Sequence, residues 1–439
     1  MEQSSHAAYR NEFFKYASPN VLGMLGLSCY ILADTFFISR GMGADGLTAL
    51  NLAIPVYSFI HGSGLMFGMG GAIKYAIFRS QKKTDQTDGV FSVTVKAAAL
   101  LAAVFLLAGL FFSETLTAML GADSAVFAMA NIYLKVILLF APAFMLNEIL
   151  LCFVRNDGAP QLAMTAMVSG SFSNIVLDYV FIFPMNMGIF GAVLATGMAP
   201  FISMAILSVH WWKKRHGFRF RLRDTAFHML LSIFSLGFPS LITELSSGVV
   251  IIVFNFILLK LQGNVGVAAY GVIANLSLVV MAVFTGIAQG VQPIISRAYG
   301  RGDREKIKYI LGCAVCLMLL IAAGIYGGIF LGADGVVSLF NSEQNIQLQQ
   351  IAAEGLKLYF TAAGFAGFNI IIAMYFASTE RAIPAHVISL LRGLFVIVPM
   401  AFVLSGLWGV TGVWLAFPVT EVLVAALGTG MYGWVSRLK

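Results

Sequence analysis

Charged side chains are scarce in this chain: Asp, Glu, Lys and Arg together make up only 11% of its 439 residues, whereas 59% are hydrophobic. An average soluble domain is about 25% charged. A soluble protein of this composition would lack the polar groups needed to cover its surface, which excludes the ordinary soluble classes. The composition instead indicates an all-α membrane protein that crosses the bilayer many times.

Cysteines and catalytic motifs are also scarce. The four cysteines all lie in apolar runs, where we expect them to be buried as small hydrophobic residues; they are Cys29, Cys152, Cys313 and Cys316. Cys313 and Cys316 form a C-x-x-C pair, but no histidine or second pair lies nearby to complete a metal or redox site. The motifs HExxH and GxSxG and acidic metal motifs are missing, so we expect no enzymatic activity and no cofactor. The polar start also lacks the pattern of a cleavable signal peptide.

Twelve apolar runs are long enough to cross a bilayer, which takes about 20 residues. They lie near 14–39, 48–76, 89–112, 125–152, 161–183, 188–212, 229–259, 266–295, 309–331, 350–378, 384–405 and 409–434. With twelve spans both termini lie on one side, and that side holds most of the 27 basic residues. The positive-inside rule therefore places the termini and the central loop in the cytoplasm, with the chain in the plasma membrane. The net charge of +7 comes from basic residues in these cytoplasmic loops. It therefore reflects membrane orientation, and we expect no nucleic-acid partner.

The second part of the chain repeats the first at an offset of about 220 residues. The paired positions include Pro19 and Pro239, Gly43 and Gly263, and Gly188 and Gly409. We therefore predict two pseudo-symmetric six-helix lobes around a central cleft, which is the plan of an alternating-access transporter. The predicted parts are a first lobe at 1–212, a basic cytoplasmic linker at 213–228 and a second lobe at 229–439.

One span, 161–183, carries an amide and a carboxylate within an apolar helix. Asn174 and Asp178 are four residues apart, so they share one helix face. A charge near the bilayer centre costs roughly 2.5–3.5 kcal/mol, which makes it by default a site for an ion or a proton. Helix rise places Asp34 and Asp178 roughly 9 Å, and Thr196 roughly 12 Å, inside the outer helix ends. If the four side chains meet, they form an all-oxygen cage for Na⁺ or for a proton shared by two carboxylates; otherwise they are separate polar helix contacts.

The second lobe does not repeat this cage. The positions equivalent to Asp34 and Thr196 are Phe254 and Phe417, which indicates that the coupling ion binds mainly in the first lobe. The second lobe has its own carboxylate, Glu244, near the middle of a span. Glu244 can attract a cationic substrate, carry a second proton or hydrogen-bond a neighbouring hydroxyl.

Other polar residues in the spans are weaker candidates. Gln289 and Gln292 lie beside a glycine and a proline, where they line the cleft at a helix bend or pack between helices. Glu148 and Glu421 can face the cleft. Arg392 has no obvious partner in the sequence. Arg155 and Arg381 occupy equivalent turns and are interpreted as turn and gate residues.

Three stretches carry a family resemblance: ADTFFISRGMGADGLTALNLAIPV, PQLAMTAMVSGSFSNIVLDYVFIF and GVAAYGVIANLSLVVMAVFTGIAQGVQPIISRAYG. They resemble the multidrug and toxic compound extrusion (MATE) family, and the resemblance covers essentially the whole chain. In prokaryotic members the first-lobe cation site consists of residues that fall on Asp34, Asn174, Asp178 and Thr196. A glutamate of span 7 falls on Glu244. The span 10 aspartate of the sodium-coupled branch is not matched, because that span has only Asn369 beyond its start.

The resemblance implies secondary active multidrug efflux, in which organic cations leave in exchange for H⁺ or Na⁺. The expected partners are small organic cations and membrane lipid, and we expect a monomer. The alternative within the superfamily is a flippase for lipid-linked oligosaccharides, which usually needs a strongly cationic cleft; the cleft residues here are acidic or neutral. An intramembrane enzyme and a channel are further alternatives that the missing motifs and the repeat disfavour.

Overall fold

The structure, a computed structural model, describes residues 2–213, 216–221, 227–341 and 344–437. These residues are helical and contain no β-strand, which confirms the predicted all-α class. The α-helices are α1 (Glu2–Ser80), α2 (Thr84–Phe111), α3 (Ser113–Met119), α4 (Phe127–Leu139), α5 (Ala141–Asn156), α6 (Pro160–Ile182), α7 (Gly188–Leu207), α8 (Val209–Trp212), α9 (Leu230–Gly300), α10 (Arg304–Phe340), α11 (Ile346–Tyr359), α12 (Ala363–Ser378), α13 (Ala382–Leu390) and α14 (Ile397–Arg437). Short 3₁₀ segments are η1 (Phe227–Met229) and η2 (Phe360–Ala362), and η3 (Leu391–Phe395) is a π-helix.

Among the described residues, eight helices are long and apolar enough to cross a membrane, or nine when α4 and α5 count as one span bent by 48°. The chain is therefore a multi-pass membrane protein. Two of these helices are long enough for more than one crossing, since α1 has 79 residues and α9 has 71. α1 runs through the predicted spans 14–39 and 48–76, and α9 runs through 229–259 and 266–295.

A glycine interrupts each of these two long helices with the same backbone conformation. Gly43 in α1 has φ 65° and ψ −151°, and Gly263 in α9 has φ 63° and ψ −152°. Only glycine adopts this region without strain. The sequence repeat pairs these two residues, and it also pairs Gly188 with Gly409, which both have φ 58°. The repeat therefore extends from the sequence to the backbone at these four positions.

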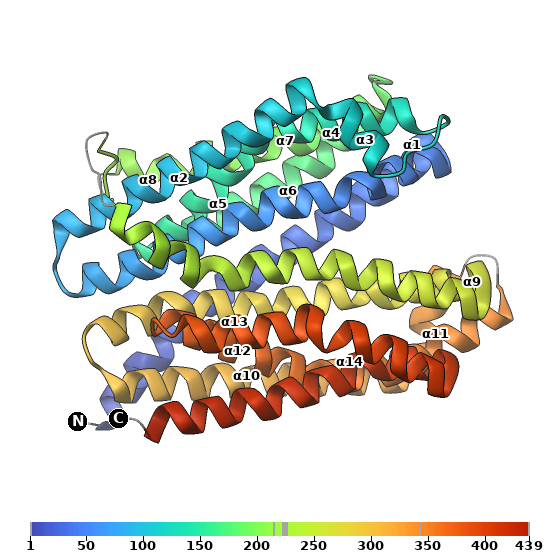
Figure 1. Cartoon of the computed structure of the whole chain (residues 1–439). Coiled ribbons are helices and arrows are strands. Elements are labelled where there is room, and N and C mark those ends of the chain that lie inside the picture. The colour runs from blue at the N-terminus through green and yellow to red at the C-terminus, as the bar shows by residue number, and fades with distance from the viewer. Residues whose placement is uncertain (1, 214–215, 222–226, 342–343, 438–439) are drawn as a thin grey trace.

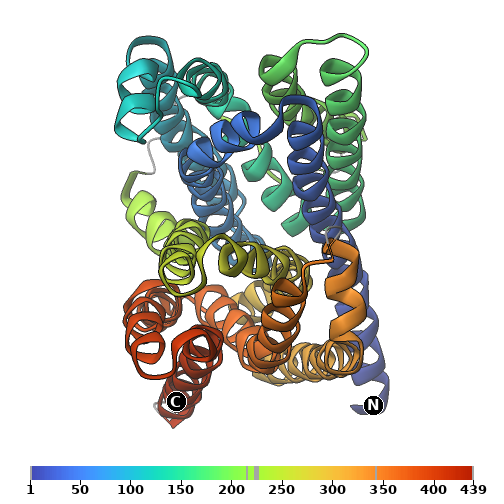
Figure 2. The same ribbon diagram turned by 90° about the vertical axis from the view of Figure 1, so that its right-hand side faces the viewer.

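Figure 1 shows the helices in two groups, with α2–α8 above and α10–α14 below, and with α9 along the boundary between them. The view turned by 90° shows the same separation (Figure 2). α1 contributes to both groups: its first turns lie beside the lower group and its later part lies in the upper group. The N- and C-terminal ends lie at the same end of the molecule, which we call the terminal end.

The two groups pack around separate hydrophobic cores, and α1 and α9 join them. The start of α1, from Phe13, belongs to the core of α9–α14. Further along, the backbones of α1 and α9 touch where Gly70 meets Gly237. A Cβ atom on Gly70 would lie 1.9 Å from the carbonyl oxygen of Ile233, and one on Gly237 would lie 1.8 Å from that of Met66. Glycine is required at this crossing because any side chain would separate the helices.

Part of the predicted linker 213–228 packs against α2, although 214–215 and 222–226 lie outside the described residues. Phe218 is fully buried, and its ring centroid lies 4.5 Å from that of Phe91. The backbone N–H of Arg219 donates to Asp88 Oδ1 at 2.8 Å. The described part of the linker is therefore fastened to the first half of the chain.

The cysteines differ in part from the prediction that all four are buried. Cys152 is buried and Cys313 is half-buried, but Cys29 and Cys316 are exposed on the helix surface. An apolar run does not distinguish the lipid-facing side of a membrane helix from its packed side, since both are apolar.

Candidate functional site

The span predicted to hold the ion site is helix α6, which buries Ser171, Asn174 and Asp178 on one face. Asn174 and Asp178 are fully buried there. Asp34 from α1 and Thr196 from α7 are also buried, and both of these helices pack against α6. The spacing of four residues thus correctly predicts the shared face of Asn174 and Asp178.

Hydrogen bonds connect the side chains of Asn174 and Asp178 and the backbone of Thr196. The side-chain amide of Asn174 is oriented so that both its nitrogen and its oxygen have hydrogen-bond partners. In this orientation Nδ2 donates to Asp178 Oδ2 at 3.0 Å, and Oδ1 accepts from the backbone N–H of Thr196 at 3.2 Å. The hydroxyl of Thr196 donates to the carbonyl oxygen of Ala192 at 3.2 Å. Asn174 therefore holds Asp178 in place against α7.

The carboxyl groups of Asp34 and Asp178 lie next to each other and interact directly. Two bare carboxylates this close repel each other, so a proton or a cation shared between them stabilises the arrangement. The Oδ1 atom of each residue is buried without a hydrogen-bond partner. The structure thus brings the two acids together and leaves one acceptor oxygen on each.

Three tyrosines that the sequence analysis did not identify surround this pair. Tyr133 from α4 is buried and lies against Thr196. Tyr30 lies one helical turn before Asp34, and its hydroxyl is 2.9 Å from that of Tyr57. The spacing of four residues between Tyr30 and Asp34 is a signal available in the sequence, whereas nothing in the sequence around Tyr133 marks it.

A cavity begins beside this site, and its polar lining comes from five helices, α1, α5, α6, α7 and α9. Its polar or ionisable lining residues are Tyr30, Tyr57, His61, Asn147, Glu148, Arg155, Ser171, Thr196, Ser203, Glu244 and Gln289. Ser171 and Thr196 connect the cavity to the ion site. His61 Nδ1 lies 3.9 Å from Glu148 Oε1. The cavity wall is therefore acidic near its middle, and Glu148 faces it as expected.

The two glutamines of α9 have different surroundings. Gln289 lines this cavity and a second cavity next to it, and it accepts a hydrogen bond from Arg155 Nη1 at 2.7 Å. Gln292 is fully buried and lines neither cavity. Its amide exchanges two hydrogen bonds with the amide of Asn156, at 2.9 and 3.1 Å. Of the two positions expected for Gln292, the structure has the packed one and not the cleft one, since Gln292 is paired with Asn156 of α5.

Polar contacts hold the halves together at the terminal end. Arg155 Nη1 donates to Asn20 Oδ1 at 2.6 Å as well as to Gln289. Lys74 pairs with Glu380, and Arg297 Nη2 donates to Glu12 Oε1 at 3.1 Å. These contacts join α5 to the first part of α1 and to α9, the later part of α1 to the turn after α12, and the first part of α1 to α9. The halves can separate at this end only if these contacts break.

The second half buries its carboxylate in a different setting. Glu421 is fully buried and does not line either cavity, contrary to expectation. Arg392 Nη2 donates to Glu421 Oε1 at 2.8 Å, and Asn369 Nδ2 donates to Oε2 at 2.6 Å. Glu421 is therefore the partner of Arg392 that sequence inspection did not find.

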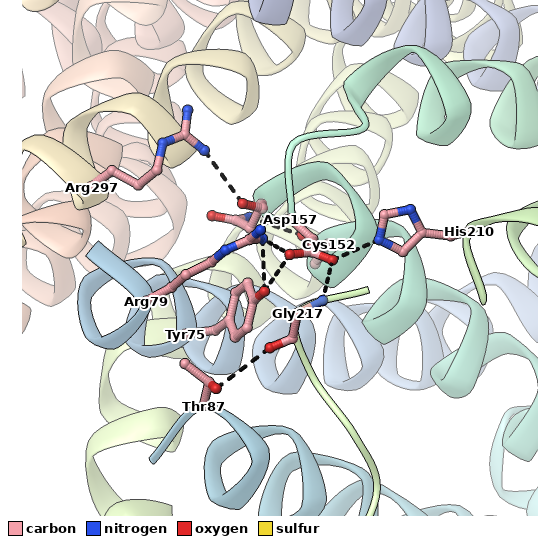
Figure 3. A network of polar contacts seen from close by, with 9 residues as sticks. Tyr75, Arg79, Thr87, Cys152, Asp157, His210, Gly217 and Arg297 are labelled. Atoms are coloured by element: carbon pink, nitrogen blue, oxygen red, sulfur yellow. Dashed lines mark hydrogen bonds and ion pairs between the residues drawn. The ribbon is translucent and has the colours of Figure 1, made fainter. Parts of the chain in front are cut away.

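Another polar cluster lies at the terminal end around Asp157, whose side chain is fully buried (Figure 3). Arg79 and Tyr75 contact one carboxylate oxygen. The other oxygen lies 2.6 Å from His210 Nε2 and accepts from the backbone N–H of Gly217 at 2.8 Å. All four partners belong to α1, α8 and the linker, so this cluster fastens the linker and leaves no carboxylate oxygen for a ligand.

Known proteins resemble this chain over most of its length. The MatE family model matches residues 19–180 and 239–403, two segments whose starts are paired by the sequence repeat. The multidrug export protein MepA of Staphylococcus saprophyticus is 26% identical over 413 residues, which cover 93% of this chain and 90% of that protein. MepA of Staphylococcus aureus is also 26% identical, over 412 residues and the same shares of both chains.

Solved transporters have the same fold. A multidrug resistance MATE family transporter in an outward-facing conformation has a TM-score of 0.91 at 23% identity, over 98% of this chain and 96% of that one. The Vibrio cholerae MATE transporter VcmN has a TM-score of 0.90 at 21% identity, over 99% of both chains. Because the family model matches most of its length, this chain belongs to the MatE family.

Proposed function

We propose that this chain is a secondary active antiporter that exports organic, mainly cationic compounds in exchange for H⁺ or Na⁺. The contact between the carboxyl groups of Asp34 and Asp178, with a partnerless buried oxygen on each, carries this proposal. Two acids held together away from water bind a proton or a small cation as a common partner. The name of the MepA relatives, multidrug export protein, supports the substrate class.

The coupling site comprises Asp34, Asn174, Asp178 and Thr196. Asn174 orients Asp178 by a hydrogen bond of 3.0 Å, and its own oxygen is tied to the backbone of Thr196. Tyr133 holds Thr196 from the opposite helix. Together they supply carboxylate, amide and hydroxyl oxygens, which suit a hard cation such as Na⁺ as well as a proton.

The architecture proposed for this function has twelve spans in two lobes around a central cleft. The lobes are 1–212 and 229–439, and the segment 213–228 joins them. The kinks at Gly43 and Gly263 support it, because each divides a helix of more than 70 residues into two parts. We propose that the chain lies in the plasma membrane as a monomer, with its terminal end on the cytoplasmic side.

The contacts at the terminal end then close the cavity toward the cytoplasm. Gln292 belongs to this closure through its amide pair with Asn156, and Gln289 belongs to both the closure and the cavity. Glu244 is the substrate-side acid or a second proton carrier. Ion binding at Asp34 and Asp178 reopens the cytoplasmic side only if the ion binds the two states with different affinity.

The free energy released by the entering ions limits the drug gradient that the exchange can maintain. One charge moving inward across 100 mV yields about 2.3 kcal/mol, or a gradient of roughly 40-fold at 1.4 kcal/mol per tenfold. If one monovalent drug leaves for each H⁺ that enters, the exchange is electroneutral and only the proton gradient drives it. Two ions per drug would make transport depend on voltage.

The proposal is tested by ethidium efflux from proteoliposomes under separately imposed pH and Na⁺ gradients. We expect the wild type to respond to at least one gradient and Asp34→Asn to respond to neither. Asp334→Asn is the matched control, because Asp334 lies exposed on α10. Efflux by Asp34→Asn at the wild-type rate would remove the coupling role, and gradient-independent leakage by the wild type would refute antiport.

A further inference from the structure

Two glutamates from different halves of the molecule face one cavity. Glu148 belongs to α5 and Glu244 to the first part of α9. Two glycines of α1 allow both to approach, since added Cβ atoms on Gly62 and Gly64 would lie 3.0 Å from Glu244 Cβ and 3.2 Å from Glu148 Cβ. The two acids are close enough to interact electrostatically. They present negative charge to the same space from opposite sides of α1.

His61 and Arg155 both interact electrostatically with Glu148, but among the described residues neither forms a close ion pair with these acids. His61 lies 3.9 Å from Glu148, a long separation for an ion pair. Arg155 gives its Nη1 to the amide oxygens of Asn20 and Gln289 and to no carboxylate. Among the ion pairs of the described residues, none includes Glu244. The cavity is therefore suited to a cation from outside the chain.

A neighbouring amide adds a specific hydrogen-bond acceptor. Asn147 lines the cavity and is 9% exposed. Its side chain lies beside the carboxyl group of Glu148, and its Oδ1 atom is buried without a hydrogen-bond partner. A buried oxygen of this kind is satisfied only when a donor arrives. The ligand that fits it carries an N–H group.

Aromatic side chains form the wall next to these groups. The rings of Tyr57 and Phe144 meet edge to face at 5.5 Å, and Tyr57 stacks on His61 at 5.8 Å. Met24 and Met167 line the same space. Aromatic faces attract cations, and methionine adapts to varied apolar shapes.

From these observations we infer that Glu148, Glu244 and Asn147 form a subsite for the protonated amine, amidine or guanidine group of an aromatic cation. The two carboxylates supply the charge, and Asn147 Oδ1 accepts an N–H from the ligand. A quaternary ammonium has no N–H and uses the carboxylates alone. This inference rests on the proposed export of organic cations and specifies which cations are held best.

A binding measurement on the purified full-length protein in lipid nanodiscs tests the subsite. The probes are fluorescent 1-pyrenemethylammonium and its N,N,N-trimethyl analogue, which differ only in the N–H groups. We expect Asn147→Leu to weaken binding of the primary ammonium about tenfold and to change binding of the trimethyl analogue by less than about twofold. Glu148→Gln and Glu244→Gln should each weaken both probes about tenfold.

The matched control is Glu354→Gln, which removes an exposed glutamate on α11. Equal weakening of both probes by Asn147→Leu would overturn the N–H selection. Wild-type affinity in both glutamine variants would overturn the subsite. If the wild type binds the probes as described but proteoliposomes do not export them, the subsite stands and the export function fails. If the wild type binds neither probe, the subsite is wrong irrespective of transport.

Discussion

In the first half of the chain, Asp34 and Asp178 meet inside the bundle with an oxygen of each left without a partner. The repeat pairs Asp34 with Phe254 and Thr196 with Phe417 in the second half. Phe254 is fully buried, and Phe417 stacks on Tyr359 with ring centroids 4.4 Å apart. Where the first half has oxygen atoms, the second half thus has a packed aromatic core.

The second half also buries an acid, but it satisfies that acid completely. Both oxygens of Glu421 accept hydrogen bonds, one from Arg392 and the other from Asn369. A carboxylate with its charge and hydrogen bonds satisfied holds helices together and has nothing left for a ligand. The comparison shows that burial alone does not identify a coupling site; the unsatisfied oxygens do.

The largest effect is expected where the first-half acids are altered. Asp178→Asn should lower ethidium efflux to the level of empty liposomes while leaving the thermal midpoint in detergent unchanged or higher, because it removes a costly buried acid. An efflux assay checks the loss of transport, and differential scanning fluorimetry on the same preparation checks the thermal midpoint. A large drop in the midpoint would mean that Asp178, like Glu421, is structural.

Breaking the second-half pair should show the opposite pattern. Arg392→Leu leaves Glu421 buried without its charge partner, which we expect to destabilise the protein by about 3–5 kcal/mol. Unfolding monitored by fluorimetry measures this loss. The double variant Arg392→Leu/Glu421→Leu should recover much of it, and no recovery would mean that Arg392 stabilises the fold independently of Glu421.

The shared scaffold predicts matched effects at the kinks. Gly43→Ala and Gly263→Ala place a Cβ in the same positive-φ conformation, and neither Cβ would meet an atom within 4 Å. Each should cost about 1–2 kcal/mol through backbone strain alone. The thermal midpoints of the two variants measure these costs. If one variant lowers the midpoint much more than the other, the two halves differ in more than their polar residues.

The smallest effect is expected at the edge of the coupling site. Tyr133→Phe removes the hydroxyl that contacts Thr196, which is worth about 1 kcal/mol and shifts the ion concentration for half-maximal efflux roughly fivefold. The control is Tyr359→Phe, a tyrosine of the second-half aromatic core. If Tyr359→Phe shifts the ion concentration for half-maximal efflux by the same amount, the effect of Tyr133→Phe does not come from the ion site, and the prediction is wrong.

Much of this arrangement could be predicted from the sequence, because helix spacing and repeats are local signals. The common face of Asn174 and Asp178 follows from their separation of four, and the equivalence of Gly43 and Gly263 follows from the repeat. Pairings between distant segments could not be predicted. Gln292 meets Asn156, and Arg392 meets Glu421, only because tertiary packing brings different helices together. The contact between Tyr133 and Thr196 likewise depends on the packing of two helices that are distant in sequence.

The central claim is that the Asp34 and Asp178 pair carries the ion that drives export. The most direct measurement records ethidium efflux and ion entry together in proteoliposomes, with pyranine reporting H⁺ and a sodium-sensitive dye reporting Na⁺. The account predicts ion entry in a constant ratio to ethidium efflux in the wild type, and loss of both in Asp34→Asn and Asp178→Asn. Coupled ion entry that persists in the double variant would contradict it.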